Sequence, residues 1–243
     1  MRIITSLIIA IFMSQPAGAT PPQIVEVSET LMGVNETHLF VLRRMDDNMG
    51  YHHITQTDIV LIARDRQTNI DAQIWPVMRV IDHGSDYLEF GQLDRVENLP
   101  LPDRVNPFDV LLWRKAKPLI ATSSEQSYLP SHEISDAKGR LEISAGEPEN
   151  MRHYQLEMEA AKTLIRQSLN KTRATLPAYF NEAGDMLQDL LFVQASDCTY
   201  SDLTVISDMK DGQYAEQWIA HVTCEEADIL SPVSMFLFIP QDM

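Results

Sequence analysis

The first half of the chain alternates between short apolar runs and polar turn clusters, as antiparallel strands do. Residues 58–64 are nearly all apolar, which is typical of a central strand buried on both faces. Residues 65–69 predict a hairpin loop, and Pro76 predicts a bulge or an edge position in the returning strand. A last hairpin is predicted around 136–139. The region 24–143 is therefore expected to be mostly β-sheet.

A short helix is predicted inside this β region. Asn106 suits the N-cap, Pro107 suits the first helical position, and the apolar run 110–113 follows. A strand is the competing prediction for 110–113. Three basic residues come next, and we attribute them to the favourable interaction of cations with a helix C-terminus; they are Arg114, Lys115 and Lys117.

The three tryptophans are candidates for core anchors. Trp75, Trp113 and Trp218 each lie inside an apolar run. A tryptophan ring buries a large apolar area when it packs in a core. We therefore expect all three rings to be buried.

The second half of the chain begins with a different period. Beyond Gly146, apolar residues recur at steps of three and four, which predicts a helix over 149–171. A second helix is predicted over 180–190, and four antiparallel strands over 191–240. The expected fold is α+β, with a strand-rich antiparallel N-terminal part followed by two helices and a C-terminal antiparallel sheet. The domains are then 20–146 and 147–243, which can also pack as one unit.

The N-terminal residues have the features of a signal peptide. Arg2 provides a positive start, residues 3–13 form a short apolar run, and Ala17, Gly18 and Ala19 fit a signal peptidase site. The apolar run is shorter than the roughly 20 residues that span a bilayer. We expect residues 1–19 to be removed and the mature chain to be exported without a transmembrane segment, to a periplasm or to the medium.

The cysteine count agrees with export. Cys198 and Cys224 are the two cysteines, and each lies in a segment with the pattern of a strand. The dipeptide at 211–212 is Asp-Gly, which favours a tight hairpin turn between them. An even count in an oxidising compartment predicts one disulfide, with a metal pair, a redox pair or free thiols as the alternatives.

Composition limits the classes of function. Apolar residues make up 44% of the 243 residues, which excludes a wholly disordered chain, and 35 acidic against 19 basic side chains leave a net charge of −16. Such an acidic protein is not expected to bind nucleic acid, and overall repulsion also opposes adsorption to anionic lipid. Glycine-rich phosphate loops are absent from the sequence, so we predict no cofactor.

Histidines provide the few candidates for site chemistry. Met49, His52 and His53 lie close together and could bind copper or zinc, but adjacent residues of a strand point to opposite faces. We therefore assign no metal and keep these three as candidate ligands. The segment beginning at His132 lacks the second histidine of the metalloprotease helix motif, because position 136 is aspartate. The turn 82–86 contains the residue types of a catalytic triad, yet neighbours in one turn cannot form one.

Two classes of function stay open. The first is an exported, soluble, non-enzymatic module that binds a protein or a cell-envelope component, possessing a sheet-rich fold with strand edges available to partners. The alternative is an exported hydrolase or metal-dependent enzyme with a site assembled from scattered histidines and carboxylates, with His83, His132 and His221 as examples. The catalytic residues stay unknown at this stage, the enzyme reading is the less favoured, and the sequence does not specify the oligomeric state.

Overall fold

The computed structural model describes residues 24–48, 54–84, 96–118, 132–136, 139–146, 149–176, 197–210, 213–226 and 229–241. The first strands are β1 (Val25–Val34), β2 (His38–Asp47), β3 (Thr55–Asp65), β4 (Asp71–Asp82) and β5 (Val96–Leu99). The middle of the chain contains α1 (Pro107–Trp113), β6 (Lys117–Pro118), β7 (His132–Asp136), β8 (Arg140–Ala145) and β9 (Arg152–Glu157). The last elements are α2 (Met158–Thr175), β10 (Asp197–Lys210), β11 (Gln213–Glu226) and β12 (Ile229–Ile239).

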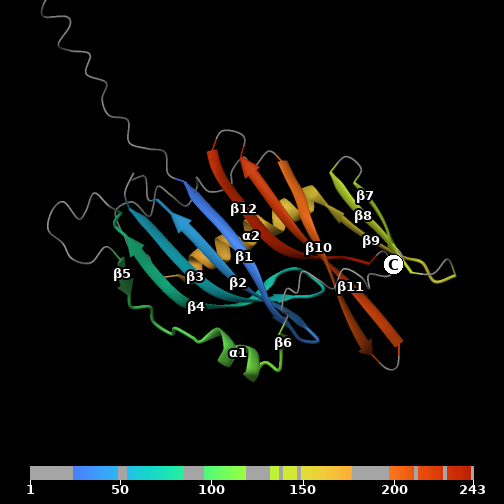
Figure 1. Ribbon diagram of the computed structural model, residues 1–243, viewed down its shortest axis with the longest axis horizontal. Helices are drawn as coiled ribbons and strands as arrows, with labels where there is room; N and C mark the ends of the chain where they lie inside the picture. The colour runs from blue at the N-terminus through green and yellow to red at the C-terminus, as the bar shows by residue number, and fades with distance from the viewer. Residues whose placement is uncertain are drawn as a thin grey trace, which may run out of the picture.

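Strands from both ends of the chain form one large mixed sheet (Figure 1). Within the described ranges it has nine strands, in the order β10-β11-β12-β1-β2-β3-β4-β5, with β6 paired to β1. β1 runs parallel to β12, and the other neighbours are antiparallel. A separate three-stranded sheet has the order β7-β8-β9. The α+β class is thus confirmed in its coarse form, but the N-terminal and C-terminal strands are joined in one sheet instead of following one another as two.

Several local predictions are confirmed. The loop after β3 is closed by the Asp65 carboxylate, which accepts hydrogen bonds from the backbone N–H groups of Gln67 and Thr68 at 3.0 and 2.8 Å. The register between β3 and β4 shifts near Pro76, as expected for a bulge. Cys198 and Cys224 face each other on β10 and β11 and form the predicted disulfide.

The predicted helix over 149–171 is wrong in its first part. Residues 152–157 form β9, which pairs with β8, and α2 begins only at Met158. Tyr154 and Leu156 are buried on one face of this strand. Positions 154 and 158 fit a helical step of four, and positions 154, 156 and 158 equally fit a strand period of two. Pairing with β8 decides between the two periods, and that pairing is not visible in the local pattern.

The remaining predictions for the second half have mixed outcomes. The predicted helix over 180–190 and the signal peptide over 1–19 lie outside the described residues. In the described part of 191–240 there are three strands, β10 to β12, rather than four. Neither helix in the described ranges is long and apolar enough to cross a membrane.

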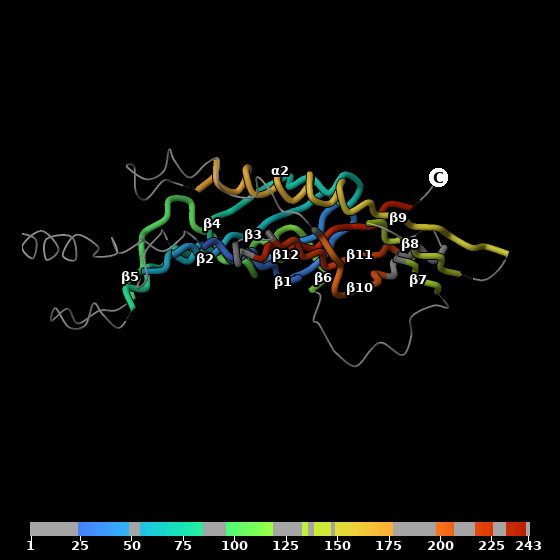
Figure 2. The backbone as a smooth tube through the Cα atoms, turned by 90° about the horizontal axis from the view of Figure 1, so that it is seen from above, coloured from blue at the N-terminus to red at the C-terminus, as the bar shows by residue number. Residues whose placement is uncertain are grey.

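The large sheet has a different helix on each face. Figure 2 shows α2 extended along one side, where its buried residues Ala161 and Ile165 join a core that includes Trp218. The opposite side is partly covered by α1, whose buried residues Val110 and Leu111 pack against neighbouring strands. Side chains alternate along a strand. Leu39 and Val41 of β2 therefore lie on the α2 side of the sheet, and Phe40 lies on the α1 side.

Candidate functional site

The histidines singled out in the sequence are not gathered into one site. His83 follows β4, with Nε2 3.5 Å from Glu97 Oε2 of β5. His221 lies on β11, and its ring stacks on Phe236 at 4.4 Å between centroids. Four strands, β12, β1, β2 and β3, separate β11 from β4 in the sheet order, and His132 lies on β7 of the other sheet.

Met49, His52 and His53 lie outside the described residues. Among the residues that are described, no group of three or more His, Cys, Asp and Glu side chains could hold a metal ion. Burial lowers the pKa of His221, so this imidazole is neutral near pH 7.

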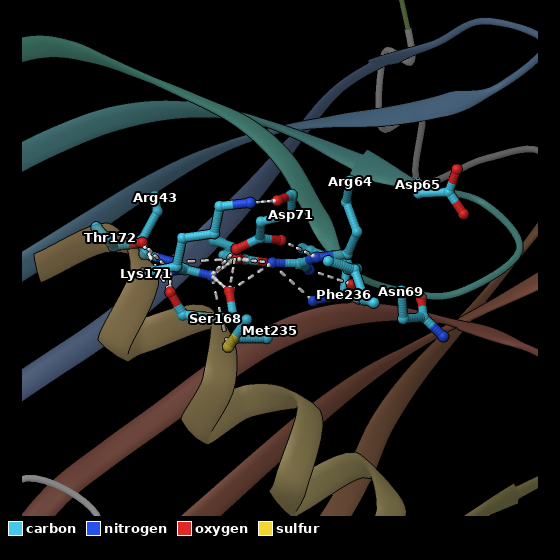
Figure 3. A network of polar contacts seen from close by, with 12 residues as sticks. Arg43, Arg64, Asp65, Asn69, Asp71, Ser168, Lys171, Thr172, Met235 and Phe236 are labelled. Atoms are coloured by element: carbon cyan, nitrogen blue, oxygen red, sulfur yellow. Dashed lines mark hydrogen bonds and ion pairs between the residues drawn. The ribbon is translucent and has the colours of Figure 1, made fainter. Parts of the chain in front are cut away.

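A network of buried charges lies between α2 and the sheet (Figure 3). Arg43 Nη2 is 2.7 Å from Glu29 Oε1, and Arg64 Nη2 is 2.8 Å from the same oxygen. Arg64 Nε also donates to Asp71 Oδ1 at 2.8 Å. All four side chains are 0% exposed. Four consecutive strands, β1 to β4, each contribute one of these charged residues.

The network fastens α2 to the sheet. Arg43 Nη1 donates to Thr172 Oγ1 at 2.5 Å and to the Ser168 carbonyl oxygen at 3.3 Å. The Ser168 hydroxyl donates to the Asp71 carboxylate, and the Lys171 ammonium donates to the Asp71 carbonyl oxygen. Ser168 and Thr172 are one turn apart, so they face the sheet together.

The same network completes the hydrogen bonding of β12. β12 is in register with β1 at Val27 and Val233, and backbone groups farther along β12 that face β1 need other partners. The Phe236 N–H donates to Glu29 Oε2 at 2.9 Å, and Arg64 Nη1 donates to the Phe236 carbonyl oxygen at 2.5 Å. Asn69 bonds both backbone groups of Phe238, at 2.7 and 2.8 Å. Glu29, Arg64 and Asn69 thus provide hydrogen bonds that a neighbouring strand would otherwise provide to this part of β12.

The electrostatics agree with a structural role. Burial by itself would raise the pKa of Glu29, but the charges of Arg64 and Arg43, with hydrogen bonds from the Arg64 side chain and the Phe236 backbone, outweigh burial and lower this pKa to about 2. Glu29 is therefore ionised near pH 7. The network joins one helix and five strands, and the charged groups of Glu29, Arg43, Arg64 and Asp71 are bonded to one another rather than exposed to solvent.

The exposed surface of α1 has the opposite character. Three large apolar side chains are mostly exposed: Phe108 by 66%, Leu112 by 78% and Trp113 by 70%. Val110 and Leu111, between them in sequence, are 8% and 7% exposed. At 100° per residue, this inward pair leaves the other three on the outward side of the helix. We call Phe108, Leu112 and Trp113 together the α1 surface.

The prediction that Trp113 is a core anchor is therefore wrong. Trp218 is confirmed as one, with 0% exposure, and Trp75 is partly buried beside α1. Residues 110–113 are all apolar, so the local pattern does not show which of them face the sheet. A seven-residue helix buries one narrow side, and Val110 and Leu111 occupy it.

Backbone contacts hold α1 firmly on the sheet. The Asn106 side chain caps the helix by accepting from the Phe108 N–H at 3.0 Å, as predicted. Val105 N–H donates to the Pro76 carbonyl oxygen of β4 at 3.0 Å, and β6 pairs with β1 on the other side of the helix. The approach of β6 is close at Gly33, where a Cβ atom would lie 2.7 Å from the Lys117 carbonyl oxygen.

Arg114 orients the exposed tryptophan. Its guanidinium carbon lies 4.5 Å from the Trp113 ring centroid and 5.6 Å from that of Trp75. The same guanidinium donates to the Gln73 side chain, and the Arg114 carbonyl oxygen accepts from Asn35 Nδ2 at 3.0 Å. Trp113 is thus exposed to solvent with its ring held in place.

Known proteins give no indication of function for the buried network or for the α1 surface. No protein-family model matches the chain, and no curated protein or solved structure matches it either. The buried network is closed to solvent, whereas the α1 surface is open to a partner. The α1 surface is therefore the candidate functional site.

Proposed function

We propose that the protein is an exported binding module that contacts a protein or cell-envelope component through the α1 surface. The observation that supports this is the exposure of Phe108, Leu112 and Trp113 on a helix whose other side is packed and capped. Adjacent exposed apolar side chains commonly mark an interaction site. Tryptophan is also prominent among the residues that dominate binding energy.

The rigidity of the α1 surface supports binding further. A side chain that is already ordered loses less conformational entropy when a partner immobilises it. Trp113 is held by Arg114, and α1 is fixed to β4 and β1 through its flanking residues. The α1 surface is therefore already ordered before a partner binds.

Export is part of the proposal and is supported by two features. The sequence begins with the pattern of a signal peptide, and the Cys198–Cys224 disulfide is the kind of bond that persists in an oxidising compartment. We propose a periplasmic or secreted location for the mature chain.

Binding can be tested by comparing two matched variants in a pull-down from the native exported fraction. The test variant carries Phe108→Ala, Leu112→Ala and Trp113→Ala. The control carries Ile134→Ala and Met151→Ala, which remove exposed apolar side chains near the other sheet. We expect the material retained by the wild type to fall at least tenfold for the test variant and to be unchanged for the control. Equal retention by all three proteins would contradict the proposal.

A further inference from the structure

Resting on the proposed function, we infer that the partner of the α1 surface is an anionic phospholipid surface. The inference combines three properties of the same segment: its local charge, its area and its position in the molecule.

The local charge is opposite to that of the whole chain. Residues 104–117 contain four basic side chains and one acidic side chain, Asp109, although the chain has 35 acidic and 19 basic residues. Arg104, Lys115 and Lys117 are exposed, and Arg114 lies against the Trp113 ring. Anionic headgroups are complementary to these cations, and each Lys or Arg near such a surface strengthens the attraction.

The overall charge of −16 opposes broad adsorption but not a contact through this segment. At physiological ionic strength, charges separated by more than about 8 Å of solvent are largely screened. The cations beside the α1 surface would touch the headgroups directly, and Asp109, which is exposed on the same helix, is the one acidic side chain of residues 104–117 that would oppose them. Binding is therefore expected to be local and weakened by salt.

The area of the α1 surface suits a bilayer better than a stable protein interface. Three side chains of this size, exposed as they are, would bury on the order of 500 Å². A standard protein interface buries roughly 800 Å² on each partner. A bilayer has no such requirement, because a few aromatic and aliphatic side chains can enter its interfacial region beside basic residues.

The position of α1 allows this contact. In Figure 1 the helix lies at the lower rim of the molecule, next to β6. A helix at the rim, with Phe108, Leu112 and Trp113 exposed, can bring these side chains to a flat surface. We therefore place Trp113, Phe108 and Leu112 among the lipid headgroups, with Lys115 and Lys117 at the phosphates.

Vesicle binding by the full chain tests the inference. We would use phosphatidylcholine vesicles with and without phosphatidylglycerol, and follow tryptophan quenching by brominated lipid. We expect binding to the anionic vesicles to be at least tenfold tighter at low salt, with quenching that Trp113→Phe largely removes. Trp218 is buried and Trp75 is partly buried beside α1, so both rings contribute less to that quenching.

Two variants separate the apolar and charged contributions. Combined Phe108→Ala, Leu112→Ala and Trp113→Ala should weaken binding to anionic vesicles at least tenfold, and the Ile134→Ala, Met151→Ala control should not. Lys115→Gln with Lys117→Gln should weaken binding to anionic vesicles severalfold and leave binding to neutral vesicles unchanged. The apolar N-terminal run 3–13 is common to all these proteins, so differences between them report on α1.

The outcomes distinguish this inference from the proposed function. Unchanged vesicle binding by the triple variant, or quenching that is undiminished in Trp113→Phe, would overturn the lipid inference. If vesicles are not bound but the triple variant loses a partner in the pull-down, the partner is a protein and the proposed function stands. Sedimentation that shows a dimer lost in the triple variant, without vesicle binding, would identify a second copy as the partner and also overturn the inference.

Discussion

The two sides of the large sheet place charged and apolar residues in opposite ways. On the α2 side, the guanidinium groups of Arg43 and Arg64 are completely buried, whereas on the α1 side the ring of Trp113 is 70% exposed. Arginine is tolerated inside because Glu29 and Asp71 pair with it and the surrounding backbone accepts its remaining hydrogen bonds. Tryptophan stays outside because two smaller residues already fill the contact between α1 and the sheet. Hydropathy alone therefore does not decide burial; the available partners do.

The largest expected effect comes from breaking the buried network. Arg64→Leu leaves Glu29 and Asp71 without one of their cations and the Phe236 carbonyl without its donor. We expect the free energy of unfolding, measured in urea, to fall by about 3–5 kcal/mol. Arg44→Ala is the control, because Arg44 is 60% exposed and pairs only at the surface with Asp46, so it should change stability by less than about 1 kcal/mol. Similar losses for both variants would refute the distinction.

Acid should weaken the network before it affects α1. The pKa of Glu29 is about 2 in the folded protein and 4.5 ordinarily, so its ionisation contributes stability that is present above pH 4.5 and lost as the pH falls toward 2. The contribution is about 3 kcal/mol. Urea unfolding followed across this range should show the decline. Glu29→Gln should be less stable at pH 7, and its free energy of unfolding should decline less steeply as the pH falls. An equally steep decline would show that other carboxylates cause it.

The anchoring of α1 should be weaker than the network but still measurable. Gly33→Ala places a methyl group against the Lys117 carbonyl and should displace β6, which lowers stability by about 1–3 kcal/mol. The displacement should also alter acrylamide quenching of the exposed tryptophan. Ser28→Ala, at an exposed position on the same strand, should stay within about 0.5 kcal/mol of the wild type. If Gly33→Ala behaves like this control, β6 does not hold α1 in place.

The smallest effect on stability is expected at the α1 surface itself. Trp113→Ala removes an exposed ring and its stacking with Arg114, and should lower the free energy of unfolding by less than about 1 kcal/mol. Trp218→Ala should lower it by about 3–5 kcal/mol, because that ring is fully buried. Thermal and urea unfolding of the two variants, side by side, measure the difference. Comparable losses of stability would mean that the Trp113 ring is packed against the protein rather than exposed to solvent.

Some features could be predicted because they depend on near neighbours in the chain. The start of α1 at Asn106 and Pro107, the hairpin after β3 and the Cys198–Cys224 disulfide were all visible in short segments. The candidate site could be predicted only in part. The run 106–113 and the basic residues after it were recognised, but the outward position of Trp113 was not. The run of four consecutive apolar residues at 110–113 was the available signal, since a helix cannot turn four consecutive side chains toward one sheet.

The amino-acid sequence by itself determined the β-rich secondary structure, the short helix, the disulfide and the expectation of export. Each of these follows from the local pattern of residues or from the number of residues of one type. Tertiary structure decided that the first and last strands share one sheet, that residues 152–157 form a strand, and which arginines and tryptophans are buried. These outcomes depend on partners far apart in the chain; Arg43 and Ser168, for example, are 125 residues apart. Burial is a property of such contacts, so residues of one type can lie inside or outside according to what they meet.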